Sequence, residues 1–270
     1  MAMDHRIALI GYGEAGSTFA RAGRWNGTRG FDLLAERRAA LAADGLTPCA
    51  GPMDAVAGAP LVLSLVTADQ AVAAATNAAP GLAAGALWCD MNSVAPETKR
   101  AAARIVEDNG GRYVDVAVLA PVDPLRLAVP VLLSGAAANE AAQALAALGF
   151  TDIRVVGDEV GRASAIKLIR SVMVKGVEAL TAEMMLAAEA AGVADEVLAS
   201  LDASERPRPW TERAAYNLER MATHGLRRAA EMDEAALCLE ALGVEPAMTR
   251  ATVRRQREAA SATPARSHAA

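Results

Sequence analysis

Three glycines near the start of the chain constrain its fold more than any other feature. Gly11, Gly13 and Gly16 stand in G-x-G-x-x-G spacing within "GYGEAG", directly after the apolar run "RIALIG" at 6–11 and before a helical pattern at 17–25. In a strand–turn–helix, the first glycine permits the tight turn, the second lets a pyrophosphate approach the backbone, and the third lets the helix pack on the strand. The helix amides then point at the phosphates. This context predicts a dinucleotide-binding site.

The cofactor contacts should come from this turn and from the ends of two further strands. Glu14 would sit in the first helical turn, where the helix dipole favours an acid. Asp32 lies 21 positions after Gly11, where a carboxylate binds the ribose hydroxyls of NAD and repels the 2′-phosphate of NADP. Arg37 and Arg38 follow and would suit that phosphate instead, so NAD is favoured with NADP left open. The predicted cofactor-binding residues are Gly11, Tyr12, Gly13, Glu14, Ala15, Gly16, Asp32, Val66 and Thr67.

The first part of the chain alternates short apolar runs with helical patterns, which is typical of βαβ units and a parallel sheet. After Gly161 the pattern is helical only. We therefore expect an α/β fold with a Rossmann-like NAD(P)-binding domain at 1–161 and an all-helical substrate and dimerisation domain at 162–270. Strands are predicted at 6–11, 29–35, 60–67, 85–93, 112–120, 129–135 and 152–157, and C-terminal helices at 163–192, 194–204, 210–223, 225–242 and 246–259.

Composition excludes several classes of protein. The net charge of −5 and the lack of a long basic run argue against nucleic acid as a partner. No stretch approaches the ~20 apolar residues of a membrane span, and the N-terminus lacks signal-peptide architecture. Three widely spaced cysteines indicate neither a disulfide framework nor a metal site. A cytoplasmic protein acting on a small molecule is expected.

The segment "CDMNSVAPETKRAAA" places Asn92 and Ser93 between a predicted strand and a predicted helix. Ligands bind at the carboxyl ends of strands in open α/β sheets, so both residues are candidates for substrate binding. Both are also good helix-capping residues, and capping is the competing interpretation.

The segment "GRASAIKLIRS" (161–171) carries Lys167, Arg170 and Ser171 on one face of a predicted helix. With "GYGEAG", "DMNSVAPETK" and "YVDVAV" (113–118), it resembles the β-hydroxyacid dehydrogenase superfamily, which includes 3-hydroxyisobutyrate and 6-phosphogluconate dehydrogenases. The resemblance implies a Rossmann-like domain, then a long helix with a catalytic lysine at position 167, then a helical domain that often forms a dimer.

Two departures separate this chain from the better-known members. Leu119, Ala120 and Pro121 stand where those members carry a serine and glycines that hold the substrate, and Ser171 stands where they carry asparagine. The stretches "IRSVMVKGVEAL" and "HGLRRAAEMDEA" are more similar to a poorly characterised branch with a divergent helical C-terminal domain. The resemblance therefore predicts hydride chemistry without predicting either of those two substrates.

The predicted reaction is hydride transfer between a nicotinamide and a small hydroxy acid or related alcohol. One proton must leave the hydroxyl with the hydride, and Lys167 is the predicted general acid or base. Apolar neighbours and the cation of Arg170 favour the neutral amine that a base requires. Substrate-binding candidates are Asn92, Ser93, Arg170, Ser171 and His224, the last from a polar helical cluster at 223–235 that reads equally well as a surface face with ion pairs. The alternatives are an imine reductase and a non-catalytic dinucleotide-binding protein.

Overall fold

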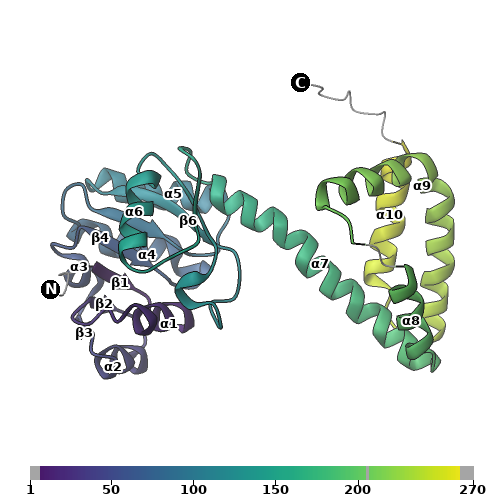
Figure 1. Cartoon of the computed structure of the whole chain (residues 1–270), viewed down its shortest axis with the longest axis horizontal. Coiled ribbons are helices and arrows are strands. Elements are labelled where there is room, and N and C mark those ends of the chain that lie inside the picture. The colour runs from purple at the N-terminus through teal and green to yellow at the C-terminus, as the bar shows by residue number, and fades with distance from the viewer. Residues whose placement is uncertain (1–6, 205–206, 262–270) are drawn as a thin grey trace. The chain divides into compact units, whose positions relative to one another are not determined.

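The computed structural model describes residues 7–204 and 207–261 of the 270-residue chain. The chain forms two compact units, residues 1–170 and 171–270, and the long helix α7 (Arg162–Ala191) has residues in both (Figure 1). The predicted domain boundary at 161–162 coincides with the start of this helix. Each unit is described by itself below.

The first unit is built on one eight-stranded sheet with the strand order β3-β2-β1-β4-β5-β6-β7-β8. All neighbouring strands are parallel except β6 and β7, which pair antiparallel. The mostly parallel sheet confirms the predicted fold class. The strands are β1 (Ile7–Ile10), β2 (Arg29–Phe31), β3 (Thr47–Pro48), β4 (Leu61–Ser64), β5 (Leu87–Asp90), β6 (Arg112–Val118), β7 (Val131–Ser134) and β8 (Ile153–Gly157).

Two buried apolar clusters lie on the two faces of this sheet, so its central strands are mostly apolar, as parallel strands buried on two sides are. Successive side chains of β5 alternate between the two faces of the sheet: Leu87 and Cys89 belong to one buried cluster, and Trp88 belongs to the other. The α-helices are α1 (Glu14–Gly23), α2 (Ala35–Ala43), α3 (Pro52–Val56), α4 (Ala71–Ala78), α5 (Pro96–Asp108) and α6 (Ala138–Ala147), with short 3-10 turns at Ala68–Gln70, Ala79–Gly81 and Arg126–Ala128.

The strand order reverses beside β1, which lies between β2 and β4. At such a point the chain leaves the two neighbouring strands in opposite directions and opens a crevice at their carboxyl ends, where ligands bind in open α/β sheets. The glycine turn follows β1 and residues 65–67 follow β4, so both predicted cofactor segments lie at this crevice.

The second unit consists of the rest of α7, α8 (Ala194–Ser204), α9 (Trp210–Ala241) and α10 (Ala247–Ser261). The prediction of two helices at 210–223 and 225–242 is wrong, because α9 runs through Gly225 without interruption. A Cβ at this glycine would collide with the main-chain oxygen of Gln256 in α10. Gly225 therefore allows close packing of α9 on α10 and does not end a helix.

Several short elements are absent from the prediction. These are β3, α3 and α6, all within the first unit. None of the described helices is both long and apolar enough to cross a lipid bilayer.

Candidate functional site

The glycine turn has the geometry of a phosphate cradle. Gly11 has a φ of +96°, and a Cβ there would collide with the main-chain oxygen of Leu65. A Cβ on Gly16 would lie 2.8 Å from the main-chain oxygen of Gly11, so this glycine lets α1 approach the turn. A Cβ on Gly13 would meet no atom within 4 Å. The backbone beside Gly13 is therefore open to a ligand, and Gly13 caps α1 without a side-chain hydrogen bond to its first amides. These features fit a pyrophosphate bound at the helix N-terminus.

Asp32 is held at the end of β2 by two main-chain amides. Its Oδ2 accepts a hydrogen bond from the amide of Tyr12 at 2.7 Å, and its Oδ1 accepts one from the amide of Leu34 at 2.9 Å. The ring of Tyr12 is fully buried and its hydroxyl donates to Asp44 at 2.8 Å. Tyr12 thus braces the turn and fixes the carboxylate of Asp32, while its side chain points into the core.

A pocket of about 860 Å³ lies beside Asp32 and Gly13. Its walls are mostly apolar, as an adenine ring requires, and they include Arg37. Arg38 does not line this pocket: its guanidinium donates to the main-chain oxygens of Asp32 and Leu33 and lies 5.8 Å from the ring centre of Phe31. Of the two arginines that the sequence offered for a 2′-phosphate, only Arg37 lines the adenosine-sized pocket.

A second pocket of about 540 Å³ begins where the first ends, and Leu65, Val66 and Thr67 line both. This shared wall makes the two pockets neighbours along the carboxyl edge of the sheet. The second pocket contains the predicted residues Glu14, Ala15, Asn92, Ser93 and Lys167. The remaining lining residues are Ala68, Met91, Val118, Ala120, Pro121 and Val122.

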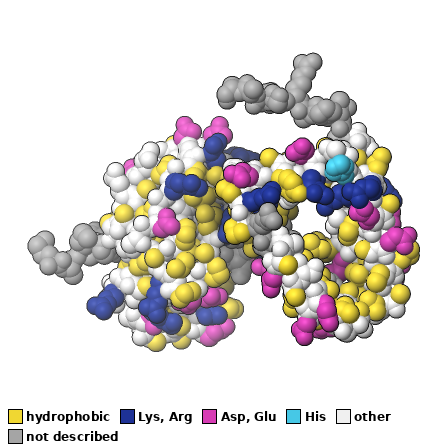
Figure 2. Space-filling model, turned by 45° about the vertical axis from the view of Figure 1, so that its right-hand side comes forward, with side chains coloured by type: hydrophobic (Ala, Val, Ile, Leu, Met, Phe, Trp, Pro, Cys, Tyr) yellow, Lys and Arg dark blue, Asp and Glu magenta, His cyan; other side chains and the backbone are white. Residues whose placement is uncertain are grey.

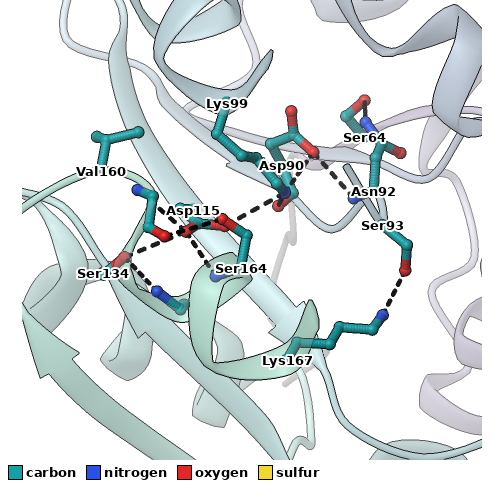
Figure 3. Close-up of polar contacts among 12 residues, drawn as sticks. Ser64, Asp90, Asn92, Ser93, Lys99, Asp115, Ser134, Val160, Ser164 and Lys167 are labelled. Carbon is teal, nitrogen blue, oxygen red and sulfur yellow. Dashed lines mark hydrogen bonds and ion pairs between the residues drawn. The ribbon is translucent and has the colours of Figure 1, made fainter. Parts of the chain in front are cut away.

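Lys167 and Ser93 form a pair in the second pocket: Nζ of Lys167 donates to Oγ of Ser93 (Figure 3). Lys167 comes from the first turns of α7, and Ser93 comes from the segment after β5. The structure therefore places together two of the predicted site residues that are 74 positions apart in the sequence.

Asn92 joins the ends of two strands. Its Oδ1 accepts from the amide of Val66 at 2.7 Å, and its Nδ2 donates to Oγ of Ser64 at 3.1 Å. Its own amide donates to Oδ1 of Asp90 at 2.9 Å. Asn92 is buried and does not cap α5, whose N-cap is Ala95. The side chain thus sets the position of the main chain at Val66, in the wall that the two pockets share.

The other predicted substrate-binding residues are Arg170, Ser171 and His224. Arg170 donates to the main-chain oxygen of Leu119 at 3.1 Å, which ties α7 to the segment after β6. Ser171 and His224 belong to the second unit, where His224 is exposed on α9. In the same polar cluster Arg227 forms an ion pair with Glu231 one helical turn on.

Beneath the pocket lies a buried charged network that sequence reasoning missed (Figure 3). Lys99 of α5 is 0 % exposed, and its Nζ donates to Oδ1 of Asp90 at 2.8 Å and lies 3.3 Å from Oδ1 of Asp115. Oδ2 of Asp115 accepts from the amide of Ser164 at 2.9 Å and from that of Gly161 at 3.2 Å. Asp115 therefore binds the N-terminus of α7.

Tyr113 completes the network, because its hydroxyl donates to Oδ2 of Asp90 at 2.6 Å. Burial, together with the charge of Asp90, raises the pKa of Tyr113 well above its usual range, so this hydroxyl stays protonated. One signal could have revealed the network: "YVDVAV" puts an acid inside an apolar strand. A buried charge needs a partner, and Lys99 lies on the inner face of α5 with Ala102, Ala103 and Val106.

The fold and the glycine cradle define the first unit as a dinucleotide-binding domain. Residues 6–157 match the model of the NAD binding domain of 6-phosphogluconate dehydrogenase, and the chain belongs to this family. Residues 188–259 match a domain of unknown function, DUF1932. The two matches confirm the resemblance seen in the sequence, including the divergent helical C-terminal domain.

Two solved structures are similar along nearly the whole chain. A conserved hypothetical protein from Sinorhizobium meliloti 1021 is 38 % identical with a TM-score of 0.64, and the match covers 99 % of this chain and 92 % of that one. A conserved protein of unknown function, described as structurally similar to 3-hydroxyacid dehydrogenases, is 30 % identical with a TM-score of 0.63 and coverages of 94 % and 96 %.

More distant structures share the fold alone. An imine reductase from Streptomyces aurantiacus is 21 % identical with a TM-score of 0.76 and coverages of 94 % and 93 %. A reductive aminase from Aspergillus terreus, in complex with NADPH and ethyl levulinate, is 19 % identical with a TM-score of 0.74 and the same coverages. Among curated proteins, an uncharacterised 28.5 kDa protein of Methanothermus fervidus is 29 % identical over 152 residues, which are 56 % of this chain and 57 % of that protein.

Proposed function

We propose that this protein is an NAD(P)-dependent oxidoreductase that transfers a hydride between the nicotinamide and a carbon bearing a hydroxyl or carbonyl group, with Lys167 as the general acid or base. One observation carries the proposal: Lys167 and Ser93 face each other in a pocket that shares the wall 65–67 with the pocket beside Asp32 and the glycine cradle. A dinucleotide laid along this edge would bring its nicotinamide end toward the lysine.

The bound nicotinamide would supply or accept the hydride, and the chain would handle the proton. In the reducing direction, Nζ of Lys167 donates a proton to the carbonyl oxygen as the hydride reaches the carbon. In the oxidising direction, the neutral amine removes the hydroxyl proton. The hydroxyl of Ser93 orients Nζ and offers the substrate oxygen a second hydrogen-bonding group. Asn92 holds the neighbouring main chain at Val66, so we assign it a role in shaping the pocket wall rather than the predicted role of a direct substrate ligand.

The proposed substrate is small and is an alcohol or a hydroxy acid. Met91, Val118, Pro121 and Val122 give the pocket an apolar wall, and Pro121 has no amide that could bind an anion. Lys167 is the one cation that lines this pocket among the described residues, and Glu14 adds a negative charge. These features favour an uncharged alcohol and its ketone over a hydroxy acid.

For the cofactor we propose NAD over NADP. The carboxylate of Asp32 is held by two main-chain amides and lines the pocket beside the glycine turn, where it would bind ribose hydroxyls and repel a 2′-phosphate. The test is to titrate each reduced cofactor by fluorescence with the wild type and with Arg37→Ala. NADH should bind at least tenfold more tightly, with little effect of the substitution. Tighter binding of NADPH that is lost in Arg37→Ala would overturn this choice.

The catalytic proposal is tested by screening reduction of uncharged ketones, 2- and 3-keto acids and a cyclic imine with NADH and NADPH. For the substrate that is turned over, Lys167→Met should lower kcat by about a hundredfold or more, with cofactor affinity retained. Lys175→Met is the matched control on the same helix, and we expect near-normal turnover from it. Near-normal turnover by Lys167→Met would contradict the assignment of the general acid or base.

The same screen separates the competing functions. The distant likeness to an imine reductase and the apolar wall of the pocket make imine reduction the second candidate. Turnover of the cyclic imine alone would favour it. Cofactor binding without turnover of any compound would favour a non-catalytic dinucleotide-binding protein.

We also propose a homodimer formed through the helical unit. Large apolar side chains of α7 and α9 are exposed in the single chain, and Figure 2 shows hydrophobic side chains between charged ones on the visible face of this unit. Single apolar residues are common on protein surfaces, whereas a large exposed apolar surface marks an interaction site. The exposed residues are Ile169, Val172, Val177, Leu180, Leu186, Leu218, Leu226 and Leu237.

A further inference from the structure

We propose that Lys99, which has no contact with either pocket, is the positioning residue that holds the Lys167–Ser93 pair together. The inference rests on the proposed function, in which this pair handles the proton. Lys99 is fully buried between two carboxylates, and each carboxylate fixes the backbone that carries one member of the pair (Figure 3).

Asp90 fixes the side of the pair that carries Ser93. It ends β5, and its Oδ1 accepts from the amide of Asn92, the residue before Ser93. Its main-chain oxygen and Oδ1 accept from Nζ of Lys99 at 2.6 and 2.8 Å, and its Oδ2 accepts from the hydroxyl of Tyr113. Both carboxylate oxygens of Asp90 therefore accept hydrogen bonds, and one of them holds the main chain just before Ser93.

Asp115 fixes the side that carries Lys167. Its Oδ2 accepts from the amides of Gly161 and Ser164, which are the first turn of α7, and Lys167 lies one turn further along. Ser134 reinforces this anchor, because its Oγ donates to Asp115 and accepts from the amide of Ala163 at 3.0 Å. The N-terminus of a helix attracts an anion, so the charge of Asp115 strengthens the attachment.

Among the described residues, Lys99 is the one cation that bridges Asp90 and Asp115. The network holds two carboxylates and one ammonium, all nearly inaccessible to solvent, and the excess negative charge faces the positive end of α7. Without Lys99, Asp90 and Asp115 would repel each other across a buried space, and the β5 segment and α7 would move apart. Ser93 lies on the β5 segment and Lys167 lies on α7. Lys99 therefore controls the distance between the side chains of Lys167 and Ser93.

The chain is well suited to a test, because only three of its 27 basic residues are lysines: Lys99, Lys167 and Lys175. Lys175 is exposed on the same helix as Lys167 and is not in the network. Mild acetylation of the full-length protein with acetic anhydride, followed by peptide mass spectrometry, gives the reactivity of Lys167 relative to Lys175. This ratio depends on how Lys167 is held and needs neither substrate nor turnover.

The variants are Lys99→Met and the double substitution Lys99→Met with Asp115→Asn. The double variant keeps the network's net charge at −1, since it removes one positive and one negative charge. Its asparagine can still accept from the amides of α7. The double variant therefore lacks the ammonium between the two anchors and adds no net buried charge. It replaces Lys99→Met in the test if that single variant does not fold. Circular dichroism establishes that the variant tested is folded.

If Lys99 positions the pair, the relative reactivity of Lys167 in a folded variant should change by at least threefold, and kcat should fall by at least tenfold. The affinity for NADH should change much less than kcat, because Lys99 lines neither pocket and the network reaches the wall of the Asp32 pocket indirectly, through Asn92 and Val66. An unchanged reactivity ratio in folded Lys99→Met, or in the folded double variant if the single variant does not fold, would overturn the inference, whatever the activity. If the wild type turns over no substrate, the proposed function fails, while the reactivity ratio still decides the role of Lys99.

Discussion

At the scale of single residues, the three glycines of the turn have different tasks, and substitution should separate them. Gly13→Val adds a side chain in a space that holds no protein atom, and its φ of −77° suits any residue. We expect the affinity for NADH to fall at least tenfold, with a change in the free energy of unfolding of no more than about 0.5 kcal/mol. Fluorescence titration and urea unfolding measure the two quantities.

Gly11→Ala is the matched comparison. It puts a Cβ against the main chain of Leu65 at a positive φ, so it should destabilise the protein by about 2 kcal/mol or more. Equal loss of stability in both variants would show that Gly13 is a structural glycine and that the open space beside it is not a phosphate cradle.

The three cysteines also differ in their surroundings. Cys238 is exposed, whereas Cys49 and Cys89 are buried. Burial, with a smaller effect from the charge of Asp90, raises the pKa of Cys89 to about 12, so its thiolate is scarce at neutral pH. With Ellman's reagent at pH 8 we expect one thiol to react rapidly in the native protein and three in urea. Rapid reaction of more than one native thiol, or its persistence in Cys238→Ser, would contradict this.

At the scale of elements, the N-terminus of α10 depends on one buried carboxylate. Glu183 of α7 accepts from the amides of Met248 and Thr249 at 2.6 and 2.8 Å, and from the hydroxyl of Thr249 at 2.6 Å. Burial raises the pKa of Glu183, but these hydrogen bonds together outweigh it and hold the pKa below its usual range. The ionised form therefore stabilises the folded state.

A lowered pKa fixes how this stabilisation depends on pH. It is fully present above the unfolded-state pKa of a glutamate, near ~4.3, and is lost as the pH falls through the lower pKa of the folded state. Glu183→Gln should weaken the protection of amides in 247–261 by about 1–3 kcal/mol at pH 7, measured by hydrogen exchange. The difference from the wild type should shrink in exchange at pH 3.5. A difference that is the same at both pH values would show that the charge is not what matters.

The elements show what the sequence could and could not reveal. Strands such as β1 and β4 were predictable because burial on both faces makes them almost entirely apolar. Helix α7 was predictable because its helical pattern continues over many turns. The predicted helix break at Gly225 was wrong because a glycine looks the same in the sequence whether it ends a helix or allows a second helix to pack closely. Lys99 and Asp115 were missed as a pair. The acid inside "YVDVAV" indicates that a buried partner is needed, but which residue supplies the opposite charge depends on how α5 packs on β6.

At the scale of the whole molecule, the predicted site residues divide between the two compact units. The cofactor cradle, Ser93, Lys167 and Arg170 lie in the first unit, and Ser171 and His224 in the second. The pattern of strands followed by helices revealed both kinds of unit in the sequence. It did not reveal the role of individual residues of the second unit, because side chains on a long amphipathic helix look alike in the sequence whether they face solvent, a ligand or another chain.

The proposed dimer gives the last prediction. Val172 on α7 is 75 % exposed and Leu218 on α9 is 65 % exposed, and burying such side chains against a second copy would remove apolar surface from water. The wild type should sediment as a dimer of about 56 kDa, twice the chain mass of 27.8 kDa. Val172→Asp with Leu218→Asp should shift it toward the monomer, because two charges would enter the buried face.

Leu125→Asp, an exposed apolar site of the first unit, is the control and should leave the dimer intact. A wild type that sediments as a monomer at all concentrations would refute the dimer, and one that stays dimeric in the double variant would place the interface elsewhere.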